Sequence, residues 1–100
     1  MRIEIDNETL FINGTSFCAC ACDLESGVYD VVARVADGDL SIIIVGTGLR
    51  FVDDYDDVGV LVAEYIVDGT PINARATLAK LCKKIVDAID KGQSVELEVM

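Results

Sequence analysis

The sequence contains no histidine, and its eight basic residues face eighteen acidic ones. Without histidine no serine or cysteine can be activated by an imidazole, and general acid–base chemistry would fall to carboxylates alone. The serines do not stand in the pattern of a nucleophile elbow. Aliphatic runs stay short, as at residues 42–45, far below the roughly 20 residues needed to cross a bilayer. We therefore expect a protein that is neither an enzyme nor a membrane protein, with no catalytic residues.

The first residues, MRIEIDNE, lack the apolar segment of a secretory signal. We therefore expect a cytoplasmic protein, located in the host cytoplasm if a phage encodes it. In that compartment Cys18, Cys20, Cys22 and Cys82 are expected to be reduced thiols. On a strand, the first three would share one face about 6.5–7 Å apart. Buried packing is the favoured interpretation, and metal binding and redox sensing are alternatives, although zinc sites usually include histidine or Cys-x2–4-Cys pairs.

Charge is sorted along the chain. Residues 1–71 carry fourteen acidic and three basic side chains, whereas residues 72–91 carry two acidic and five basic ones. The formal net charge is −10. Such a surface repels nucleic acid and anionic membranes but attracts basic proteins. We therefore expect a basic protein partner, with no direct binding of nucleic acid or membrane.

Alternating apolar and polar residues predict strands over the first two-thirds of the chain. Asn7-Glu8 and Asp37-Gly38 are typical of tight hairpin turns. Residues 58–67 are predicted to form one long strand. This strand and residues 40–45 are apolar on both faces, which is typical of strands covered on both sides. Residues 94–99 alternate again and predict a final strand.

After residue 69 the apolar period becomes helical. Thr70 and Pro71 are typical of an N-cap and first helical position, and Gly92 of a residue just past a helix end. The apolar stripe of this predicted helix, about residues 71–91, consists of Ala74, Leu78, Leu81, Ile85 and Ile89.

We therefore predict a single acidic α+β domain, residues 1–100. It would hold a mainly antiparallel curved sheet of about six to eight short strands, the C-terminal helix packed on it, and a final strand. Because one helix covers one face, either the sheet curls over itself or a second chain covers the other face.

The densest acidic segment is residues 53–57. A calcium loop could begin at Asp54, but Val58 and Tyr65 stand where an EF-hand needs oxygen ligands. A non-standard weak Ca²⁺ or Mg²⁺ site, a solvated loop and an acidic contact surface are the remaining interpretations. Tyr55 would anchor such a surface, because interface hot spots favour tyrosine. The predicted partner-binding residues are Asp53, Asp54, Tyr55, Asp56 and Asp57, and no metal ligand is assigned.

No cofactor motif is complete. Gly46 and Gly48 resemble the start of a dinucleotide fingerprint, but the third glycine and the following helix are missing. In size, acidity and lack of catalytic groups the chain resembles the small inhibitors of phages and toxin systems: anti-CRISPR and other anti-defence proteins, DNA mimics and immunity proteins.

The resemblance implies stoichiometric inhibition by masking a basic surface of a partner that normally binds nucleic acid. One alternative is an assembly protein that forms a homodimer through its sheet, or through a basic helix face (Lys80, Lys83, Lys84) paired with acidic residues of a second copy. The other is a thiol metal-binding protein.

Overall fold

The computed structural model describes residues 1–100 and holds ten strands and one helix. The elements are β1 (Arg2–Asp6), β2 (Thr9–Ile12), β3 (Thr15–Ala21), β4 (Gly27–Ala36), β5 (Asp39–Ile44), β6 (Leu49–Val52), β7 (Gly59–Ala63), β8 (Tyr65–Val67), β9 (Thr70–Ile72), α1 (Ala74–Asp90) and β10 (Val95–Val99). The fold is α+β with a single helix, as predicted.

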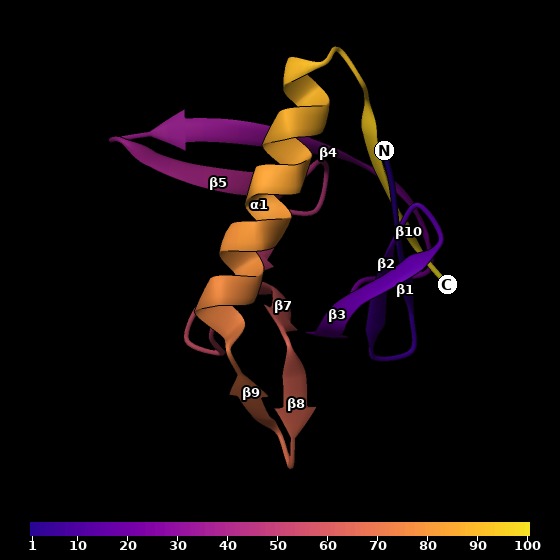
Figure 1. Ribbon diagram of the computed structural model, residues 1–100, viewed down its shortest axis with the longest axis vertical. Helices are drawn as coiled ribbons and strands as arrows, with labels where there is room; N and C mark the ends of the chain where they lie inside the picture. Colours follow the sequence, from indigo (N-terminus) through magenta and orange to yellow (C-terminus); the bar gives the residue numbers. More distant parts are fainter.

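Eight strands close into a barrel in the order β1-β10-β4-β5-β6-β7-β3-β2, so the predicted open curved sheet is wrong. Closure depends on β1, which pairs antiparallel with β2 and parallel with β10. Figure 1 shows the two chain ends on the same side of the molecule, where β1 and β10 lie together. Neither parallel pair, β1–β10 or β6–β7, is joined by a hairpin turn, so alternation alone did not reveal them. The sheet thus curls over itself.

Both predicted hairpin turns are confirmed. Asn7 has φ 60°, and Asp37 and Gly38 have φ 53° and 81°, the positive values that a primed turn requires. The β4–β5 hairpin extends away from the barrel (Figure 1), and only Ile43 and Ile44 of β5 pair with β6.

The predicted long strand over residues 58–67 is interrupted at Glu64, whose backbone N–H donates to the carbonyl of Ile72 at 3.0 Å. Beyond this point β8 turns at Asp68 and Gly69 and pairs with β9 as a separate two-stranded sheet. The predicted helix start at Thr70 and Pro71 is therefore wrong, because both residues lie in β9. Strand pairing prevails over the local capping signal.

The helix α1 begins after Asn73, which adopts a left-handed conformation, and ends as predicted before Gly92. The N–H of Gly92 donates to the carbonyl of Ile89 at 2.9 Å. The buried face of α1 is rotated slightly from the predicted apolar stripe, since Leu78 and Ile89 are only half-buried. The buried residues of α1 are Ala74, Thr77, Leu81, Ile85 and Ala88. The helix is not long and apolar enough to span a membrane.

One core unites the barrel interior with the buried face of α1, where Leu81 and Ile85 are fully buried. The prediction that two strands are covered on both faces is confirmed for β7, whose residues 60–63 are all buried. It is wrong for residues 40–45, because Leu40 and Val45, at the two ends of this segment, are both 45% exposed.

Candidate functional site

The predicted contact residues lie in the connection between β6 and β7, residues 53–58, called the acidic loop here. The two strands are parallel, with Val52 opposite Leu61, so the chain must run back along the sheet between them. Parallel strands usually need a connection of a dozen or more residues, whereas here there are six. The short acidic loop therefore folds over the outer face of the barrel.

The return of the chain requires a glycine at position 59. A Cβ atom at Gly59 would lie 2.1 Å from the carbonyl oxygen of Arg50 and 2.8 Å from a methyl group of Val52. Glycine is therefore needed here because the backbone of β6 approaches closely, not because of its φ angle. This contact sets where the acidic loop ends.

Hydrogen bonds fix the shape of the loop. One carboxylate oxygen of Asp54 accepts from the backbone N–H groups of Asp56 and Asp57, at 3.0 and 3.1 Å. The Arg50 guanidinium lies 3.4 Å from the carboxylate of Asp57. Carboxylate oxygens of Asp53, Asp54 and Asp57 lie within 4.8 Å of one another. Because these charges repel one another, a cationic group of a partner would be attracted to the loop.

A cavity of about 390 Å³ lies between the acidic loop and the outer face of the barrel. Val52 and Leu61 are 3% and 2% exposed, yet they lie outside the main core, on the face that the loop covers. Tyr55 and Val58 lie at the other side of the cavity and are 58% and 76% exposed. The remaining lining residues are Ala21, Asp23, Leu49, Asp54, Asp57 and Gly59.

A second acidic surface was not predicted. On β1 and β10 the apolar side chains point inward and the carboxylates outward, and the register places Glu4 opposite Glu98 and Glu96 opposite Asp30 of β4. This surface, called the acidic strand face here, consists of Glu4, Asp6, Asp30, Glu96 and Glu98. Its signal was present in the alternating segments RIEID and VELEV, but only barrel closure brings them together.

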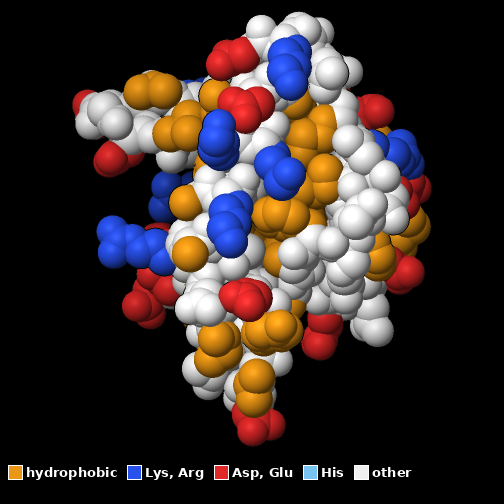
Figure 2. All heavy atoms as spheres, in the orientation of Figure 1, with side chains coloured by type: hydrophobic (Ala, Val, Ile, Leu, Met, Phe, Trp, Pro, Cys, Tyr) orange, Lys and Arg blue, Asp and Glu red, His pale blue; other side chains and the backbone are white.

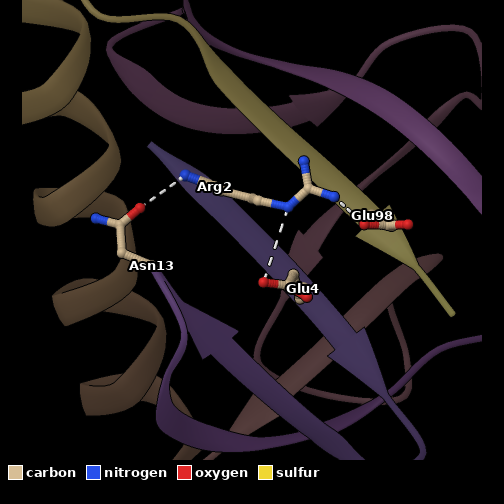
Figure 3. Close-up of polar contacts among 4 residues, drawn as sticks. All are labelled: Arg2, Glu4, Asn13 and Glu98. Carbon is tan, nitrogen blue, oxygen red and sulfur yellow. Dashed lines mark hydrogen bonds and ion pairs between the residues drawn. The ribbon is translucent and has the colours of Figure 1, made fainter.

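Arg2 offsets part of the charge on the acidic strand face. Its guanidinium contacts the carboxylate of Glu98 and lies 3.8 Å from that of Glu4, while its backbone N–H donates to the side chain of Asn13 at 2.9 Å (Figure 3). In strand order β10 lies three positions from β6, so the two acidic surfaces occupy different parts of the barrel wall.

Comparison with protein-family models, curated proteins and solved structures gave no match. The function is therefore inferred from the surfaces of the chain itself. Figure 2 shows cationic side chains gathered along α1, where Lys80, Lys83 and Lys84 are exposed. Lys83 pairs with Asp87 at 3.1 Å, and the ammonium of Lys84 lies 5.9 Å from the ring centre of Phe17. Much of this basic face is thus occupied by contacts within the chain.

The thiols are free and lie in different environments. Cys18 and Cys20 point into the barrel, where burial raises their pKa to about 11 and about 12. Burial also raises the pKa of Cys82 on α1. A thiol with a raised pKa stays protonated at neutral pH, whereas nucleophilic attack and metal ligation both need the thiolate. The environment of the three therefore favours packing.

Proposed function

We propose that this protein is a non-enzymatic acidic inhibitor that masks a basic surface of a partner protein, with the acidic loop as its contact. The observation that supports this most directly is the combination, on one outer face, of four aspartates with an exposed Tyr55 and an apolar cavity. Charge alone would not single out this loop.

The composition of the site matches what protein interfaces need. Apolar and aromatic groups at the centre of a contact supply most of the affinity, while charged groups at its rim steer association and exclude wrong partners. The acidic loop offers both within a few residues. A partner surface that normally holds nucleic acid is rich in Lys and Arg, so carboxylates would occupy the positions of phosphates.

The test compares two variants that lower the net negative charge equally. One changes Asp53, Asp54, Asp56 and Asp57 to Asn. The other, on the acidic strand face, combines Glu4→Gln, Asp6→Asn, Asp30→Asn and Glu96→Gln, which spares Glu98, the partner of Arg2.

Immobilised wild-type protein and both variants are incubated with extract of the native host, and retained proteins are quantified by mass spectrometry. We expect a basic protein that wild type and the strand-face variant retain and the loop variant loses. The purified partner should then lose its binding to nucleic acid when the wild-type protein is added at equal concentration. Equal retention by all three proteins would contradict a role for the acidic loop.

A homodimer is the second candidate, and one feature favours it. In the projecting β4–β5 hairpin, Val35 is 68% and Leu40 45% exposed, and residues 39–42 of β5 have no neighbouring strand on their outer side. An open strand edge with apolar side chains is a ready template for pairing with another chain. Light scattering over a dilution series tests this: a mass above 10.8 kDa that Leu40→Lys restores to monomer would support a dimer.

A further inference from the structure

We infer that the cavity under the acidic loop receives a single arginine side chain of the partner, an inference that rests on the proposed function and names the group that its contact would recognise. The carboxylates by themselves do not define the site. The cavity does, because it combines an apolar floor, an aromatic side chain and charge of only one sign.

The floor and walls suit the aliphatic part of a long side chain. Val52 and Leu61 lie at the bottom, with Ala21 and Leu49 beside them. The volume of about 390 Å³ falls in the range of roughly 300–1,000 Å³ typical of ligand pockets. A long basic side chain buries its methylene groups against such a surface and keeps its charged head at the opening.

The charge of the lining selects a cation. Asp23, Asp54 and Asp57 line the cavity, and no Lys or Arg does. Arg50 pairs with Asp57 from outside the lining, so Asp23 and Asp54 are the two carboxylates that remain for a ligand. The hydrogen bonds that fix the loop occupy only one carboxylate oxygen of Asp54, which leaves the other to accept from a ligand. By contrast, the cavity near the C-terminal end of α1 is lined by Lys84, Lys91 and Asp87, so its charge is mixed. A third cavity, lined by Phe17 and Tyr65, has the single carboxylate of Glu64, so only the cavity under the loop combines three carboxylates with no basic residue.

Arginine fits better than lysine for two reasons. Its guanidinium is planar, stacks on aromatic rings and is more weakly hydrated than an ammonium. Tyr55 offers such a ring at the opening, exposed over 58% of its surface. The guanidinium can also bond with two carboxylates at once, and here carboxylates lie on both the β3 side (Asp23) and the loop side of the cavity.

The experiment is a titration of ¹⁵N-labelled protein, followed by NMR, with three synthetic peptides that differ at one central residue: arginine, lysine or the neutral arginine analogue citrulline. Both neighbours of that residue are glycine. We expect saturable shifts at the cavity residues with the arginine peptide, about threefold weaker binding with lysine, and at least tenfold weaker binding with citrulline.

Two variants separate insertion into the cavity from general attraction. Ala21→Leu fills the cavity without changing charge, and its matched control, Ala79→Leu, lies at an exposed position of α1. We expect Ala21→Leu to weaken binding of the arginine peptide about tenfold and Ala79→Leu to leave it unchanged. Tyr55→Ala alters an exposed side chain, so it tests the same cavity if Ala21→Leu does not fold.

The outcomes distinguish the inference from the function on which it rests. Equal affinity for arginine and lysine peptides, with no effect of Ala21→Leu and Tyr55→Ala, would overturn insertion of an arginine. In that case acidic masking would still be supported if wild type retains a partner in the host-extract experiment and the loop variant does not. If the peptides show no preference for arginine and the loop variant also retains the partner as wild type does, both the inserted arginine and the proposed function would be overturned.

Discussion

The acidic loop and the acidic strand face carry similar charge but differ in what lies beneath it. The acidic loop is one continuous segment over a cavity, with an exposed aromatic ring among its carboxylates. The acidic strand face combines three strands over tightly packed core residues. Each surface is contacted by one arginine of the chain, the strand face by Arg2 and the loop by Arg50. The number of charges therefore does not identify a binding surface. What matters is the apolar surface that a partner can reach between them.

The two surfaces also differ in how they are held. The acidic strand face is anchored by continuous ladders of β1 with β10 and of β10 with β4. The acidic loop depends on three paired residues in each of β6 and β7 and on one close backbone contact at Gly59. Its position should therefore be the easier one to disturb.

The largest effect is expected from Gly59→Ala. The added methyl group would overlap the carbonyl of Arg50, so β6 and β7 must separate, which should lower the free energy of unfolding by about 3 kcal/mol. Asp30→Ala, on the acidic strand face, is the control and should change it by less than about 0.5 kcal/mol. Denaturation with urea measures both, and equal midpoints would show that the loop is not anchored through Gly59.

A substitution in the barrel interior, which lies beneath both acidic surfaces, should lower the stability of the whole domain. Cys20 is fully buried in the barrel, so Cys20→Ser would bury a hydroxyl group and lower the free energy of unfolding by about 1–3 kcal/mol. Cys22→Ser, at a half-buried position, should cost less. A Cys20 variant as stable as wild type would show that the barrel interior holds a partner for the new hydroxyl.

The same thiols predict a loss of stability at alkaline pH. Their pKa rises from 9.0 to about 11 for Cys18 and about 12 for Cys20, so between these values the unfolded chain loses protons that the folded chain keeps. Their stabilising contribution is complete below pH 9 and lost as pH rises towards 11–12. The melting temperature should decrease less from pH 8 to pH 10.5 in the double variant Cys18→Ala, Cys20→Ala than in the wild-type protein. An equal decrease in both proteins would exclude the thiols as its cause.

The contrast between the two acidic surfaces can be measured directly in binding. Once a partner is purified, changing the four aspartates of the acidic loop to Asn should slow association about tenfold at low salt and flatten its salt dependence. The strand-face variant described above should slow it less, because its charges lie farther from the contact. Equal slowing, measured by stopped flow, would indicate that only net charge matters.

The smallest effect is expected from Arg2→Ala. Exposed ion pairs contribute about 0–1 kcal/mol, and the side chain of Arg2 is 46% exposed. The Arg2→Ala variant should have a lower free energy of unfolding than wild type mainly at low salt, where the neighbouring glutamates repel one another most. Measurements at low and high salt test this. A loss well above 1 kcal/mol would show that Arg2 is structurally necessary to the seam between β1 and β10.

Sequence reasoning succeeded where the signal is local. The turns at Asn7 and Asp37 and the helix end at Gly92 each follow from one or two residues. It failed at Thr70 and Pro71, which look like a helix start but form a hairpin with β8 across Asp68 and Gly69. It also failed where distant pairing decides, as in the closure of β1 against β10.

The candidate site shows the same division. Composition and clustering select Asp53, Asp54, Tyr55, Asp56 and Asp57 as the proposed contact, and the structure places all five in one loop between β6 and β7. The cavity could not be predicted, because it exists only when β6 and β7 pair in parallel and Ala21 of β3 comes alongside. The acidic strand face depends in the same way on the pairing of β1 with β10.

The position of β10 also has a consequence for synthesis on the ribosome. This strand, residues 95–99, lies between β1 and β4, so neither neighbour can complete its hydrogen bonds until the end of the strand has emerged. The hairpins β1–β2 and β4–β5 can form earlier, because their contacts are local. A nascent chain therefore exposes two open strand edges until translation has passed residue 99. Pairing across almost the whole sequence is slow to form, so this interval is when the chain is most exposed to aggregation.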